Sequence, residues 1–202
     1  MAVLNWPNRI TLTRILLIAP LVICLLNLGD GGAMWRRLAL LLFLAMAASD
    51  AIDGFLARRF GEETALGRFL DPVGDKLLIV CTIIILAVPA TAVAGYRLPT
   101  WVVVIAVGKD LLTVIGFLLV YVVTGRWLVQ ARAWGKSCTL VQLAMVAFTL
   151  AAPDLPAVLA QGVPVLWWLA SGLAVLTVAD YVRLGSRFAA EAPPGPAREQ
   201  RP

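Results

Sequence analysis

The amino-acid sequence predicts an all-α, polytopic integral membrane protein with six transmembrane helices and a short amino-terminal interfacial helix. Of its 202 residues, 61% are hydrophobic and only 14% are charged, against about 25% in a typical soluble domain. The mean hydropathy is +0.89. Only structures that satisfy their own backbone hydrogen bonds can face lipid, and long apolar runs do so as helices.

Each predicted span supplies the roughly 20 mostly apolar residues that a bilayer core requires. The six spans are expected at 11–28, 35–57, 72–95, 99–124, 136–153 and 163–185. Residues 1–10, with Trp6 and Pro7, are expected to lie at the membrane interface. The first span is not interpreted as a cleavable signal peptide, because no small-residue cleavage site with a hydrophilic region follows it.

One membrane domain, residues 1–188, is expected, followed by a disordered cytoplasmic tail at 189–202 that is rich in Pro, Ala and charge. With six spans, both termini lie on the same side of the membrane. Lys and Arg residues in the short connections number thirteen on that side and three on the other. The positive-inside rule therefore places both termini in the cytoplasm. The net charge of +5 then faces anionic headgroups, and no basic soluble surface indicates a nucleic-acid partner.

Four aspartates, Asp50, Asp53, Asp71 and Asp75, lie between two long apolar runs. An ionised carboxylate at the edge of hydrocarbon is costly, so each is a functional candidate. On helices, the first two are i,i+3 neighbours and the last two are i,i+4 neighbours, so each pair projects from one face. The alternative is that they cap helix ends or are simply solvated. All four at this spacing favour a shared cation.

Small residues accompany both carboxylate pairs, because Gly54 and Ala57 continue the first face and Gly67 precedes Asp71 by four. A bulky ligand therefore has room to approach the helix backbone. Four hard oxygen ligands suit Mg²⁺ or Mn²⁺. Zinc is not expected, since the chain has no His and its three Cys are isolated in apolar segments.

The pattern Asp-x2-Asp-Gly-x2-Ala-Arg-x8-Gly-x3-Asp-x3-Asp, from Asp50 to Asp75, resembles the signature of the CDP-alcohol phosphotransferases, also called the class I CDP-alcohol phosphatidyltransferases. Pro7-Asn8, Thr11 and Arg14 resemble the amino-terminal element of that family. Gly135-Lys136, Thr139 and Gln142 resemble the start of its fifth helix. The resemblance extends over most of residues 5–187, although only the aspartate motif is diagnostic.

This resemblance implies transfer of a phosphatidyl group from CDP-diacylglycerol to an alcohol, with release of CMP, by a homodimer with two Mg²⁺ or Mn²⁺ ions per site. The four aspartates would hold the metal ions, and Asp75 would also be the general base. The CDP-lipid would be bound by Asn8, Thr11, Arg14, Gly54, Ala57, Arg58 and Gly67. The acceptor would be bound by Arg132, Lys136 and Arg183.

The favoured acceptor is glycerol 3-phosphate, because the surroundings of Arg58 and Asp71 resemble that branch of the family. Lys109-Asp110-Leu111-Leu112 departs from it, and a CMP-forming cardiolipin synthase that uses phosphatidylglycerol is the alternative. Inositol phosphate and serine are less favoured acceptors. A cation-coupled transporter or a structural lipid-binding subunit is the non-enzyme alternative. Transporters usually carry repeated halves with broken helices, and no repeat is visible here.

Four other charged residues lie in or near the spans. Lys109 and Asp110 are expected to form an internal salt bridge, with a role lining the site as the alternative. Lys136 could snorkel to the interface instead of binding the acceptor. Asp180 has no explanation from the sequence.

Overall fold

The structure is a computed structural model, and every element in the part that it describes is helical. It describes the backbone of residues 6–60, 65–124 and 133–190, and the side chains of residues 16–29, 32–49, 76–116 and 134–186. The elements are α1 (Trp6–Leu26), α2 (Leu28–Phe60), α3 (Ala65–Ala87), η1 (Pro89–Thr91), α4 (Thr100–Thr124), α5 (Ala133–Ala151), η2 (Ala152–Asp154), α6 (Ala157–Ala160) and α7 (Val163–Ala190).

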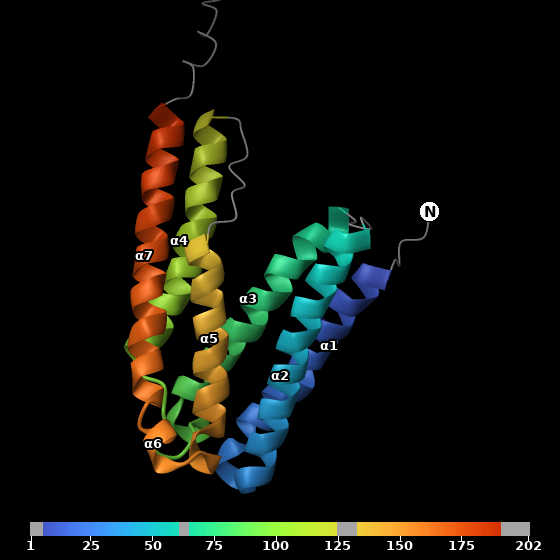
Figure 1. Ribbon diagram of the computed structural model, residues 1–202, viewed down its shortest axis with the longest axis vertical. Coiled ribbons are helices and arrows are strands. Elements are labelled where there is room, and N and C mark those ends of the chain that lie inside the picture. The colour runs from blue at the N-terminus through green and yellow to red at the C-terminus, as the bar shows by residue number, and fades with distance from the viewer. Residues whose placement is uncertain (1–5, 61–64, 125–132, 191–202) are drawn as a thin grey trace, which may run out of the picture.

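The long helices form two groups (Figure 1). In the first group, α1 packs along both α2 and α3, and in the second group α7 packs along both α4 and α5. The groups meet where α2 contacts α5 and where α3 contacts α4 and α5. Large side chains fill the interior between the helices, and the largest of them are Phe43, Leu21, Leu25, Met46, Ile83, Leu86, Leu98, Met145 and Leu150.

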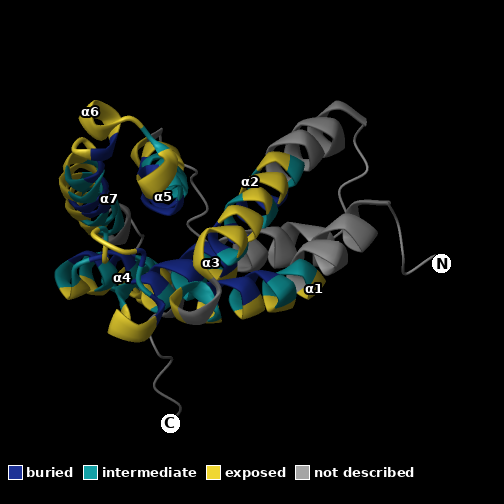
Figure 2. Cartoon of the chain, turned by 90° about the horizontal axis from the view of Figure 1, so that it is seen from below, coloured by how far each residue is buried: buried dark blue, intermediate teal, exposed yellow. Residues whose placement is uncertain are grey.

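Many residues on the outer faces of the helices are exposed (Figure 2), and large apolar side chains are among them. They include Met34, Leu140 and Trp168, the last of which stacks on Trp101 of α4 with ring centroids 4.5 Å apart. A soluble monomer rarely exposes apolar patches of this extent. Three described segments are long and apolar enough to cross a membrane, namely Gly32–Ser49, Trp134–Asp154 and Ala157–Ser186. These surfaces indicate an integral membrane protein.

The predicted spans all fall on long helices, with two differences in detail. The third span was expected to continue to residue 95, but α3 ends at Ala87. Pro89 explains the end, because the residue before a proline is disfavoured in the α conformation. The Thr91 hydroxyl then donates to the Ile85 carbonyl at 2.6 Å, which satisfies one group at the helix end. The same helix begins at Ala65, before the predicted span, so that Gly67, Asp71 and Asp75 lie on one helix, as their spacing predicted.

The connection between the first two predicted spans is shorter than expected. The α1 helix ends at Leu26, α2 begins at Leu28, and a single non-helical residue inside α2, Gly32, makes the break. Its φ of 61° and ψ of −149° suit glycine, which lacks a Cβ. The α1 helix is continuous from Trp6, so no separate interfacial helix is seen among its residues. Six membrane crossings and the interfacial position of residues 1–10 stay predictions.

At one end of the molecule, Arg36 joins the two groups of helices. This residue of α2 is buried, and its Nη1 donates to the Leu150 carbonyl at 2.7 Å while its Nη2 donates to Asp154 Oδ1 at 2.8 Å. Arg37 Nε donates to the other oxygen of Asp154 at 3.0 Å from an exposed position. We call this arrangement the Arg36 tie. It holds the start of α2 against the end of α5.

Replacing Arg36 by Met should destabilise the fold, because the buried Leu150 carbonyl loses its side-chain donor. An unsatisfied buried group of this kind costs about 1–3 kcal/mol. Denaturation of the purified protein in detergent would measure the loss. The matched variant Arg37→Met removes only an exposed pair and should have a much smaller effect. Equal effects of the two variants would contradict the assignment of the tie to Arg36.

Candidate active site

The aspartate motif spans the end of α2 and the start of α3. Asp50 and Asp53 lie in the last third of α2, and Asp71 and Asp75 lie in the first half of α3. The two helices are consecutive, and their motif-bearing ends lie at the same end of the molecule in Figure 1. The backbone therefore brings the two carboxylate pairs to one end. The side chains of all four aspartates are outside those that the structure describes.

The predicted CDP-lipid residues follow the same pattern. Gly54, Ala57 and Arg58 lie in α2, and Gly67 lies in α3. Asn8, Thr11 and Arg14 lie in the first half of α1, which begins at that end of the molecule and packs on both α2 and α3. The side chains of these seven residues are outside the described set, so their contacts with a ligand stay predictions. Their helices, however, converge as the motif requires.

The described side chains next to the motif form a chain of polar contacts across three helices. Asp110 Oδ1 of α4 forms ion pairs with Lys109 Nζ at 3.1 Å and with Lys76 Nζ of α3 at 3.4 Å. Lys109 Nζ also donates to Gln142 Oε1 of α5 at 3.4 Å. Lys109 and Gln142 are buried. The salt bridge expected between Lys109 and Asp110 is confirmed, and we call the whole set the Asp110 network.

Sequence reasoning missed two members of this network. Lys76 is one of the thirteen basic residues expected on the side of the termini, and Gln142 belongs to the segment that resembles the start of the family's fifth helix. A signal existed for Lys76, since it directly follows Asp75 in a chain whose charged residues are scarce. The partner of Lys76 lies 34 positions later on another helix, and local periodicity does not indicate such a contact.

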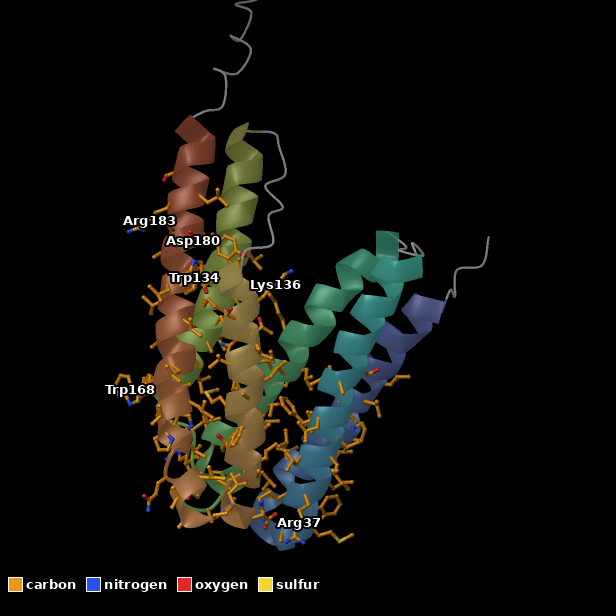
Figure 3. The ribbon with its side chains drawn as sticks, viewed as in Figure 1. Arg37, Trp134, Lys136, Trp168, Asp180 and Arg183 are labelled. Atoms are coloured by element: carbon orange, nitrogen blue, oxygen red, sulfur yellow. The ribbon has the colours of Figure 1, made fainter. Side chains whose placement is uncertain are left out.

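Two residues predicted to bind the acceptor, Lys136 and Arg183, extend to different sides of the second group of helices. Lys136 is exposed near the start of α5 and extends toward the side on which α3 lies (Figure 3). Arg183 of α7 extends outward on the opposite side of the same group. Arg132 lies outside the described residues. Lys136 is therefore the described acceptor candidate that extends toward the motif-bearing helices.

A cavity of about 330 Å³ lies at the other end of α2, between the Gly32 break, residues 92–94 and Pro153. It is lined mostly by small residues and by Arg36 of the tie. Arg36 precedes Asp50 by 14 residues, or about 21 Å of helix. The cavity is therefore remote from the aspartate motif.

The aspartate set fits a divalent cation by its chemistry. Carboxylate oxygens from two neighbouring helix ends are the hard ligands that Mg²⁺ and Mn²⁺ prefer. Among the residues whose side chains are described, no three His, Cys, Asp or Glu residues gather into another possible metal site. The motif therefore remains the candidate metal centre that the sequence predicts.

The fold and the motif together define a class: a helical integral membrane protein whose acidic motif is shared between consecutive helices at one end. Residues 4–182 match the model of the CDP-alcohol phosphatidyltransferase family. The chain therefore belongs to the CDP-alcohol phosphatidyltransferase family, and the resemblance seen in the aspartate motif is confirmed.

Relatives with assigned names agree with this membership. A CDP-diacylglycerol–glycerol-3-phosphate 3-phosphatidyltransferase of Bacillus subtilis is 35% identical over 155 residues, which is 72% of this chain and 76% of the relative. A probable phosphatidylglycerophosphate synthase of Mycobacterium tuberculosis is 32% identical over 178 residues, which is 88% of this chain and 80% of the relative. A Pseudomonas fluorescens protein with the first name is 43% identical over 84 residues, or 41% of each chain.

Proposed function

We propose that this enzyme transfers the phosphatidyl group of CDP-diacylglycerol to glycerol 3-phosphate and releases CMP. The observation that carries the proposal is the complete aspartate motif across the adjoining ends of α2 and α3. The names of relatives matched over most of their length support this donor and this acceptor. The product would be a phosphatidylglycerol phosphate, an intermediate for phospholipid synthesis.

In the proposed site, Asp50, Asp53, Asp71 and Asp75 hold two Mg²⁺ or Mn²⁺ ions. When bound, such ions neutralise the pyrophosphate and stabilise the negative charge on departing CMP. Gly54 and Ala57 leave space for the nucleotide against α2, and Arg58 pairs with a phosphate. Asn8, Thr11 and Arg14 of α1 line the same side of the donor, as does Gly67 of α3.

The proposed reaction is a direct displacement at the phosphorus on the lipid side of the pyrophosphate. The acceptor hydroxyl oxygen forms the new bond to phosphorus, and the bond from that phosphorus to the oxygen of CMP breaks. Asp75 takes the hydroxyl proton as general base. We propose no covalent enzyme intermediate, and positioning and electrostatics supply most of the acceleration, as in other phosphoryl transfers.

The proposed topology places both termini and the motif on the cytoplasmic side of the cytoplasmic membrane. The positions of the charges support it, because Arg36, Arg37 and Arg97, the three residues assigned to the outside, belong to the end of the molecule that is remote from the motif. Lys136 and Arg183 lie toward the other end (Figure 3). The homodimer implied by the family resemblance remains part of the proposal.

The first test is CMP release by the purified protein from CDP-diacylglycerol with a panel of acceptors. Glycerol 3-phosphate should support release, and chelator should abolish it until Mg²⁺ or Mn²⁺ is restored. Calcium should not restore it, because its looser coordination suits two-metal transfer poorly. Release that depends on phosphatidylglycerol alone would instead identify a cardiolipin synthase. No release with any acceptor would return a transporter or a lipid-binding subunit to consideration.

The second test separates ligands from base. Asp50→Asn, Asp53→Asn and Asp71→Asn should each weaken binding of metal and CDP-diacylglycerol. Asp75→Asn should retain metal-dependent donor binding and lose turnover by about 10²–10⁴-fold, the usual contribution of a positioned base. Equilibrium binding and CMP release, measured on the same preparations, compare the two classes. Loss of donor binding in Asp75→Asn equal to that in Asp50→Asn would make Asp75 mainly a ligand.

The third test concerns Lys136. A phosphate monoester carries about 1.5–2 negative charges at neutral pH, so a nearby cation is needed to hold glycerol 3-phosphate. Lys136→Ala should raise the KM for this acceptor strongly and leave donor binding nearly unchanged. Arg183→Ala should have a smaller effect, because that side chain extends away from α3. An unchanged acceptor KM in Lys136→Ala would mean that the lysine only snorkels.

A further inference from the structure

The Asp110 network joins the motif-bearing helix to the second group of helices. Lys76 belongs to α3 and immediately follows Asp75, whereas Asp110 and Gln142 belong to α4 and α5. Within the described side chains, the pair Lys76–Asp110 is the ion pair between α3 and α4. The position of this part of α3 relative to α4 is therefore coupled to one carboxylate.

Burial of the inner part of the network fixes the carboxylate with which Lys76 pairs. The Lys109 side chain is only 7% exposed and that of Asp110 17%, while Lys76 is 42% exposed. A buried ammonium is costly without a partner. Lys109 and Gln142 consequently hold Asp110 in place from the α4 and α5 side. The Lys76 ammonium is the most exposed of the three charged groups.

The helix geometry of α3 relates this contact to the motif. Neighbouring positions on an α-helix are about 100° apart around the axis and 1.5 Å apart along it. A contact that holds position 76 against α4 thus restricts both the rotation and the translation of α3 at position 75. It also restricts position 71, which lies about one turn earlier on the same helix.

We propose that Asp110 is a positioning residue. By holding Lys76 against α4, it fixes the orientation in which α3 presents Asp71 and Asp75 to the metal ions. This inference rests on the proposed function. It assigns to Asp110 an indirect role, through Lys76, rather than contact with substrate. Removal of the carboxylate should weaken metal binding even though no metal ligand has changed.

Manganese binding tests this directly. The purified protein in detergent is titrated with Mn²⁺, and electron paramagnetic resonance measures the free ion. Asp110→Asn should raise the Kd for Mn²⁺ about 10- to 100-fold, the usual effect of losing a residue that orients metal ligands. Lys76→Gln should produce a rise of similar size. The double variant should show no further rise, because both changes break one contact.

Asp154→Asn is the matched control. It also removes a carboxylate shared by two cations, the adjacent Arg36 and Arg37 of α2, but at the end remote from the motif. It should lower thermal stability and leave the Kd for Mn²⁺ unchanged. Unfolding curves for every variant ensure that binding is measured on folded protein, so a general loss of stability cannot imitate the positioning effect.

An unchanged Kd in folded Asp110→Asn, or in Lys76→Gln, would overturn the proposal. If Asp110→Asn does not fold, Lys76→Gln decides alone, since its side chain is partly exposed and its removal should be tolerated. Wild-type protein that binds Mn²⁺ and releases CMP while both variants bind normally would refute only the positioning role. Wild-type protein that neither binds Mn²⁺ nor releases CMP would refute the proposed function together with it.

Discussion

Ions inside an apolar bundle must be neutralised where they lie, and this constraint organises the described structure. Two carboxylates are each shared between two cations: Asp154 between Arg36 and Arg37, and Asp110 between Lys76 and Lys109. Each joins a helix of the first group to a helix or turn of the second. Apolar packing holds each group of three long helices together and continues between the groups, and these polar contacts add charged links between the two.

The aspartate motif differs from these two carboxylates in a way that suits its proposed role. It concentrates four acidic residues on the adjoining ends of α2 and α3, and only a few basic residues are near them in the sequence. A structural ion pair needs one cation for each carboxylate, and Asp110 and Asp154 each have two. An excess of negative charge beside hydrocarbon is instead expected of a site that binds cations from solution.

The sequence predicted the helical class, the positions of the long helices and the family, because each depends on local composition or on a motif of fixed spacing. It also predicted the pair Lys109–Asp110, whose members are adjacent. It did not predict the contacts of Arg36 with Leu150 and Asp154, which are more than 110 residues apart.

Nor did it predict the end of α3 at Ala87, although Pro89 was a visible signal. The apolar run continues past that proline, and its length predicts a longer helix than the one that forms. The aspartate side chains lie outside the described set, so the site itself stays a prediction from the sequence that the helix arrangement supports. Long-range polar contacts depend on how whole helices pack, which no single segment encodes.

The Arg36 tie fixes one end of α2 far from the aspartate motif. It fastens α2 to the end of α5 at one extremity, while Asp50 lies about 21 Å along the same helix. If α2 were tilted by about 10° at Arg36, position 50 would be displaced by about 4 Å over that length of helix. The angle that α2 makes at the tie therefore sets where its motif-bearing end lies.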